Sequence, residues 1–121
     1  MSRKRMALAV LVLSILFATG CRSKHVEVTV TNHTGSALRL LEVDYPSASF
    51  GADSMSSDGV LHYRIQLQGS GLIKVQYTAP DNSQPQMTGP SVFEGQRGRL
   101  EIILLPAGKA EFHPRLTLTG E

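Results

Sequence analysis

Alternation of apolar and polar residues is the feature that most limits what this chain can form, and it runs through most of the sequence after residue 24. Residues 25–31 read His-Val-Glu-Val-Thr-Val-Thr, which places Val26, Val28 and Val30 on one side. Successive side chains of a β-strand point to opposite faces, so such a segment offers one face to a core and the other to solvent. No segment after residue 24 shows the apolar spacing of an amphipathic helix. The sequence therefore predicts an all-β domain.

Turn signals divide the alternating segments. Further strands are predicted at residues 37–45, 61–67, 73–78, 92–94, 100–105 and 112–118, and residues 32–35 predict a turn. The sequence Gly-Ser-Gly at residues 69–71 predicts a tight hairpin between its two neighbouring strands. Two longer stretches are predicted as loops. They are residues 46–59, with at most a short strand around Ser49 and Phe50, and the Pro-, Asn- and Gln-rich residues 79–90.

Three details place individual strands. The alternation slips by one residue at Leu40-Leu41, which indicates either a β-bulge or a strand that is covered on both faces. Residues 100–105 are apolar on both faces in their second half, as expected of a central, buried strand. Pro114 cannot donate a backbone hydrogen bond, so the last strand is predicted at a sheet edge.

About seven or eight short strands at this spacing predict an antiparallel β-sandwich, either immunoglobulin-like or transthyretin-like. The chain has no Trp and one Cys, so it lacks the tryptophan and the disulfide that mark antibody domains. Residues 25–121 are predicted to form this one domain. It is preceded by a segment of a different kind.

The first 20 residues have the three-part composition of an export signal. Arg3, Lys4 and Arg5 form a basic head, residues 6–17 are almost entirely apolar, and small residues follow. A membrane-spanning helix needs roughly 20 apolar residues, and this apolar run is shorter. We therefore expect residues 1–20 to be a helical signal peptide that is removed from the mature protein.

The residues that end this segment, Phe17-Ala18-Thr19-Gly20-Cys21, resemble the bacterial lipobox, although Ala18 stands where a bulky aliphatic residue is usual. The resemblance implies cleavage between Gly20 and Cys21, and acyl chains such as palmitate on Cys21. The partner it implies is the membrane, with residues 21–24 as a short tether. It also implies a place in the cell envelope and, in a host with two membranes, the outer membrane facing the periplasm, because Arg22 rather than Asp follows the cysteine. Cys21 is the only cysteine, so no internal disulfide can form.

Charge argues against nucleic acid as a partner. Of the 12 Lys and Arg, three (Arg3, Lys4 and Arg5) lie in the signal, which leaves nine against 10 Asp and Glu. A mature domain near neutrality lacks the clustered basic face that nucleic-acid binding requires. The same balance predicts no strong attraction to anionic lipid.

No arrangement of residues predicts catalysis, a metal site or a cofactor. The four histidines are His25, His33, His62 and His113, and none of them has a partner at metal-ligand spacing. Asp44, Asp53 and Asp58 match no calcium motif. No Ser, His and Asp set stands out. We therefore do not expect an enzyme, and a small metal-dependent or hydrolytic enzyme would require His62, His113 and an acidic residue to converge.

One apolar group stands beside a polar stretch. Tyr45, Pro46 and Phe50 form either an interaction loop or a plug that closes one end of the sandwich. Residues 44–51, with residues 62–64 and 69–71, resemble small bacterial lipoproteins, a resemblance that implies no activity. The sequence therefore predicts a lipid-anchored, non-catalytic module of the cell envelope that interacts with an envelope protein or has a structural role. The alternative is a module that binds a solute or glycan at the membrane surface.

Overall fold

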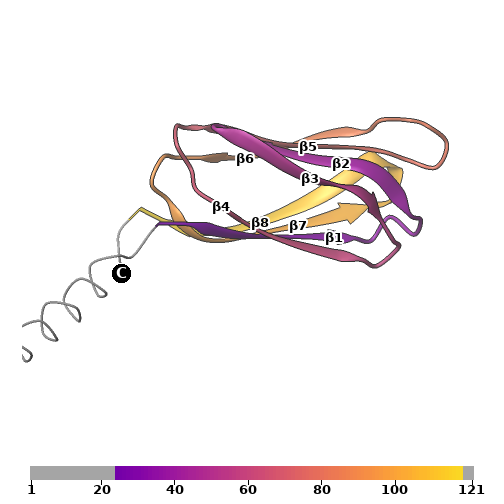
Figure 1. Cartoon of the computed structure of the whole chain (residues 1–121), viewed down its shortest axis with the longest axis horizontal. Helices are drawn as coiled ribbons and strands as arrows, with labels where there is room; N and C mark the ends of the chain where they lie inside the picture. The colour runs from indigo at the N-terminus through magenta and orange to yellow at the C-terminus, as the bar shows by residue number, and fades with distance from the viewer. Residues whose placement is uncertain (1–23, 119–121) are drawn as a thin grey trace, which may run out of the picture.

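The computed structural model describes residues 24–118, which fold into a sandwich of two four-stranded sheets (Figure 1). The first sheet has the order β4-β1-β7-β8 and the second has the order β3-β2-β5-β6. The predicted β-sandwich is confirmed, whereas the signal peptide and Cys21 lie outside the described residues. The strands are β1 (Val26–Asn32), β2 (Leu38–Tyr45), β3 (Ala48–Met55), β4 (Val60–Ile65), β5 (Gly71–Thr78), β6 (Gln86–Val92), β7 (Arg97–Leu105) and β8 (Lys109–Thr117), with a 3₁₀ turn at Pro106–Gly108.

The position of β1 distinguishes between the two predicted kinds of sandwich. β1 runs parallel to β7 and antiparallel to β4, while β2 lies in the opposite sheet. In immunoglobulin constant domains the first two strands share a sheet. The strand order therefore favours the transthyretin-like arrangement of the two.

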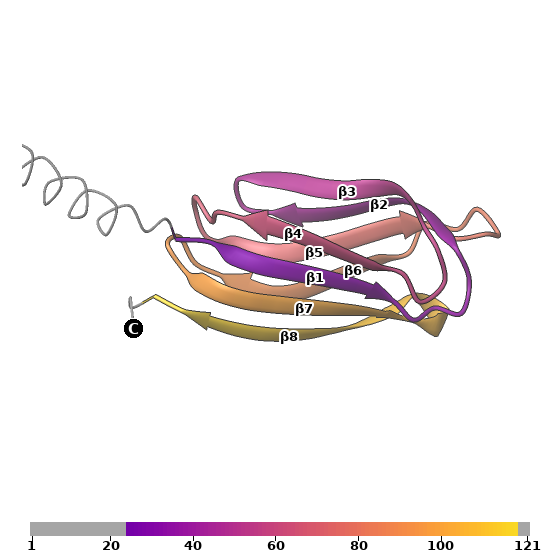
Figure 2. The same cartoon turned by 60° about the horizontal axis from the view of Figure 1, so that its bottom comes forward.

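The core lies between the sheets and follows the predicted alternation. Figure 2 shows β1, β7 and β8 side by side in the first sheet. β7 has a neighbour on each side and β8 has only one, so the central and edge positions predicted for these strands are both confirmed. The fully buried apolar side chains of the first sheet are Val26, Val28, Val30, Leu100, Ile102 and Leu104.

The slip at Leu40 is a β-bulge. The register between β2 and β5 shifts between Arg39 and Glu42, and Leu40 has a φ of 52°. Because the bulge adds one residue, Leu38 and Leu41 both point into the core while Leu40 is 59% exposed. β3 approaches closely here, since a Cβ on Gly51 would lie 1.9 Å from the Leu41 carbonyl oxygen.

The predicted hairpin at residues 69–71 is wrong. Within the described chain β4 pairs with β1, and β5 pairs with β2 and β6, so Gly69-Ser70-Gly71 joins the two sheets instead. Both flanking segments do alternate, but alternation shows that a strand has a core face and does not identify its neighbour.

Two predicted loops are partly strands. Ala48–Met55 is an eight-residue strand, β3, at the edge of the second sheet. Only Phe50 and Met55 of this strand are buried, so its sequence shows no apolar alternation. Gln86–Val92 forms β6, which takes in most of the second half of the predicted loop at residues 79–90. Of the strand predicted at residues 92–94, only Val92 belongs to β6, and residues 93 and 94 lie in the turn that follows.

Candidate functional site

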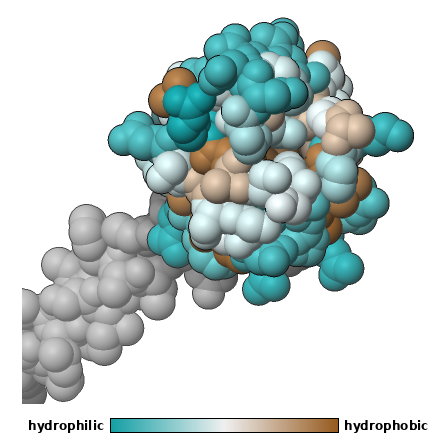
Figure 3. Space-filling view, turned by 90° about the vertical axis from the view of Figure 1, so that its right-hand side faces the viewer, coloured by the Kyte–Doolittle hydropathy of each residue, from teal (hydrophilic) through white to brown (hydrophobic). Residues whose placement is uncertain are grey.

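A cleft of about 740 Å³ opens at the end of the sandwich opposite Lys24. We call it the distal cleft. Three connections form it: residues 33–37 between β1 and β2, residues 79–85 between β5 and β6, and Pro106–Gly108 between β7 and β8. In Figure 3, which faces this end, a few apolar side chains lie in the middle among residues of intermediate hydropathy, and most of the rim is hydrophilic. The connection at residues 79–85 projects furthest (Figure 1).

A buried asparagine holds the first wall in place. Asn32 is 0% exposed at the end of β1. Its Nδ2 donates to the carbonyl oxygens of Ser36 and Ser56, both at 2.9 Å. Its Oδ1 accepts hydrogen bonds from the Thr34 backbone N–H at 3.1 Å and from Thr34 Oγ1 at 2.7 Å. One side chain therefore joins the β1–β2 turn to the β3–β4 turn.

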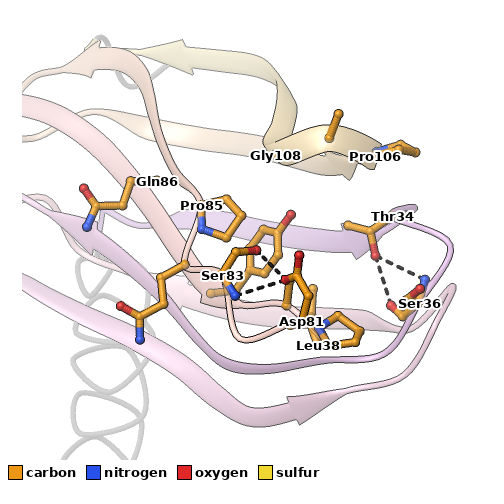
Figure 4. Close-up of a pocket in the computed structure, with 14 residues that line it drawn as sticks. Thr34, Ser36, Leu38, Asp81, Ser83, Pro85, Gln86, Pro106 and Gly108 are labelled. Atoms are coloured by element: carbon orange, nitrogen blue, oxygen red, sulfur yellow. Dashed lines mark hydrogen bonds between the residues drawn. The ribbon is translucent and has the colours of Figure 1, made fainter.

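The second wall is a compact turn built around Asp81. The carboxylate Oδ1 accepts hydrogen bonds from Ser83 Oγ at 2.6 Å and from the Ser83 backbone N–H at 3.0 Å (Figure 4). These bonds favour the charged form, so the Ser83 hydroxyl first and its backbone N–H second hold the pKa of Asp81 below its usual value. Arg39 Nη2 donates to Asn82 Oδ1 at 2.9 Å and links the turn to β2. The cleft thus carries a carboxylate at neutral pH.

Replacing Ser83 with alanine tests this turn. Because the hydroxyl is the larger cause of the low pKa, we expect Ser83→Ala to raise the pKa of Asp81 toward its ordinary value. A titration of the Asp81 carboxyl followed by NMR measures the shift. The same titration on Ser91→Ala, at an exposed serine of β6, serves as the control. An unchanged pKa in Ser83→Ala would contradict the geometry.

The third wall and the floor complete the cleft. Ala107 and Gly108 both have positive φ, 63° and 70°, so the turn before β8 is left-handed there. A Cβ on Gly108 would lie 3.2 Å from Cβ of Pro85, which shows how closely the second and third walls approach. Leu38 and Tyr77 form the floor, and Tyr77 is only 5% exposed. Burial raises the pKa of Tyr77, so its hydroxyl is neutral at physiological pH.

The lining suits binding rather than catalysis. It combines three prolines with hydroxyl and amide groups and a single carboxylate, and it contains no histidine. Such a surface can pack against apolar groups and donate or accept a few hydrogen bonds. In residues 24–118 no group of three or more His, Cys, Asp and Glu is placed to hold a metal ion. The polar members of the lining are Thr34, Ser36, Asp81, Ser83, Gln84 and Gln86.

The residues of the predicted interaction loop lie at the other end of the sandwich. Tyr45 and Pro46 are half-buried beside the β2–β3 turn, and Phe50 is 6% exposed in β3. The Phe50 ring stacks on Tyr63 with centroids 4.5 Å apart, and Tyr45 lies 6.3 Å away. Phe50 therefore has the buried position that the end-plug alternative requires. Gly20 and Cys21, the predicted cleavage and lipid sites, lie outside the described residues.

The histidines do not converge. His62 lies on β4 and His113 on β8, the two outer strands of the first sheet. Three strand spacings separate them, about 14 Å. His62 is within 3.3 Å of Thr29 Oγ1, and His113 is 3.2 Å from Glu111. The condition for a metal-dependent or hydrolytic site at these residues is not met.

Comparisons with known proteins inform the fold alone. No protein-family model matches the chain, and no curated protein matches it. The chain is similar to the NMR structure of a protein from Eubacterium rectale, with a TM-score of 0.55 at 10% identity, covering 75% of this chain and 88% of that one. Among the described residues there is no helix of the length and hydropathy needed to cross a membrane.

Proposed function

We propose that this protein is a lipid-anchored, non-catalytic module of the bacterial cell envelope that binds another envelope protein in its distal cleft. The observation that carries the proposal is that the connections lining the cleft lie at the end of the sandwich opposite the start of β1 (Figure 1). If Cys21 carries the acyl chains, Lys24 is the third residue after the anchor. The backbone between them then spans at most about 10 Å. The cleft then faces away from the membrane, where an envelope partner can reach it.

The walls of the cleft support a protein partner. They are connecting segments held on a rigid sandwich, which is how such folds commonly present binding residues. Internal hydrogen bonds order two of these segments, around Asn32 and around Asp81. Little conformational entropy therefore has to be lost when a partner binds.

Binding of a small solute is the second candidate. A volume of about 740 Å³ falls within the range of small-molecule sites. A glycan is supported less well, because Tyr77 is the only aromatic residue of the lining and its ring is almost wholly buried. It offers no open face on which a sugar ring could stack.

A charge placed in the cleft tests the proposal. Ala107 is left-handed, a conformation that Asp tolerates well, so Ala107→Asp adds a carboxylate without backbone strain. We expect affinity capture from native membranes to recover at least tenfold less partner with Ala107→Asp than with the wild type. Gln68→Asp adds the same charge at the opposite end and is expected to capture the partner normally. Equal capture by Ala107→Asp would contradict a role for the cleft.

A further inference from the structure

The end of the sandwich at which the described chain begins carries several connections of its own. The Gly98 backbone N–H donates to the His25 carbonyl oxygen at 3.2 Å, which fixes the start of the chain beside β7. The Gly95 N–H donates to the Leu67 oxygen at 3.2 Å, so the β6–β7 turn rests on the β4–β5 connection. In Figures 1 and 2 β8 also ends here. We call this region the tether end.

Two large apolar side chains are exposed at the tether end. Phe93 is 51% exposed in the β6–β7 turn, and Leu118, directly after β8, is 56% exposed. The Phe93 backbone is held in place, because its N–H donates to Gln96 Oε1 at 2.8 Å and its carbonyl oxygen accepts from the Gln96 N–H at 3.2 Å. A rigid turn thus presents a phenyl ring to the surroundings.

A row of charged residues, three arginines and one glutamate, crosses the outer face of the first sheet near this end. The register places Arg64, Glu27, Arg99 and Arg115 on four neighbouring strands in that order. Arg64 Nε pairs with Glu27 at 2.7 Å. Arg99 and Arg115 are exposed and lie directly opposite each other, and their side chains form no ion pair or hydrogen bond within residues 24–118.

This pair of arginines indicates an anionic ligand. Like charges at directly opposed positions destabilise a sheet, and an anion between them relieves the repulsion. Guanidinium groups bind phosphate oxygens through paired hydrogen bonds. Glu27 and Glu101 line the same hollow, so binding of an anion depends on the two directly opposed guanidinium groups and not on a net positive charge of this surface.

The short tether determines which phosphates lie nearby. An acylated Cys21 is held at the membrane interface, and its distance of at most about 10 Å from Lys24 keeps the tether end against the lipid headgroups. Exposed apolar and cationic side chains suit that boundary, since rings and aliphatic chains enter the acyl region while guanidinium groups remain among the phosphates.

We propose that the tether end is seated on the bilayer, with Phe93 and Leu118 in the interface and Arg99 and Arg115 on the phosphates of anionic lipids. The inference rests on the proposed lipid anchor and adds a fixed orientation to it. This orientation keeps the distal cleft pointing away from the membrane.

Depth-dependent fluorescence quenching tests this seating. The mature lipidated protein carries one further cysteine, Glu94→Cys, beside Phe93, and a fluorophore labels that thiol alone because Cys21 is acylated. The protein is reconstituted in phosphatidylcholine vesicles containing a quarter phosphatidylglycerol and a brominated lipid. We expect the label at residue 94 to be quenched at least threefold more than a label on Gln84→Cys at the distal cleft. Adding Arg99→Glu and Arg115→Glu is expected to remove most of the difference.

Each of the other outcomes contradicts one part of this proposal. If the protein floats with the vesicles but both labels are quenched equally, the seating is wrong and the anchor stands. If quenching at residue 94 survives the two Arg→Glu changes, the arginines do not bind the headgroups. If the label at residue 94 is shielded from solvent in native membranes but exposed to solvent in lipid-only vesicles, a protein covers the tether end instead. If the protein does not float at all, the anchor fails and the seating fails with it.

Discussion

We expect Asn32→Ala to lower the free energy of unfolding by about 3 kcal/mol, the largest effect of a single substitution at the distal cleft. The side chain is 0% exposed and satisfies backbone groups of two turns. Alanine fills the space incompletely and leaves these groups without their partner, and each buried group left unpaired costs about 1–3 kcal/mol. For a domain of this size we expect a melting temperature about 15 °C lower.

Thermal unfolding followed by circular dichroism measures the effect. The matched control is His33→Ala, the next residue, whose side chain is exposed and whose backbone N–H bond to the Leu104 oxygen is retained. We expect the control to stay within about 0.5 kcal/mol of the wild type. A similarly small change for Asn32→Ala would show that the network does not stabilise this end of the fold.

The second large effect concerns the anchor. We expect Cys21→Ser to abolish lipidation completely, because the lipid is attached through the cysteine sulfur and a serine hydroxyl is a much weaker nucleophile than a thiolate. Since acylation precedes cleavage, the signal is then not removed either. The precursor then keeps residues 1–20, and the protein incorporates no labelled palmitate. Electrophoretic mobility and metabolic labelling measure both effects, and treatment with globomycin should likewise leave precursor. Normal maturation of Cys21→Ser would contradict the lipoprotein assignment.

The sequence predicted the fold class well because the core strands carry strict alternation. Val26, Val28 and Val30 are all buried, and the slip at Leu40 is a bulge, one of the two expected alternatives. The two edge strands of the second sheet, β3 and β6, were harder to predict. β3 has neighbours on one side only and buries two side chains, so Ala48–Met55 looked like a loop.

Strand partners and the cleft could not be derived from local pattern. β4 pairs with β1, and the paired residues are 29 to 39 positions apart in the sequence, although a glycine-rich turn joins β4 to β5. The distal cleft is made by three connections that are distant in sequence. The signals available were the proline and glutamine content of residues 79–85 and the Pro106 turn, and both predicted only irregular structure. Asn32 was predicted in a turn, but its burial depends on strands that come later in the chain.

Site-specific photocrosslinking in native membranes tests the central claim most directly. A photoreactive residue replaces Gln84 in the distal cleft, and in the control it replaces Gln68, an exposed glutamine at the tether end. We predict one protein adduct from position 84, absent from position 68 and abolished by Ala107→Asp. A protein adduct that forms from position 68 and not from position 84 would contradict the account, because the partner would then bind away from the cleft. The absence of an adduct from both positions would equally contradict a protein partner and favour a small solute.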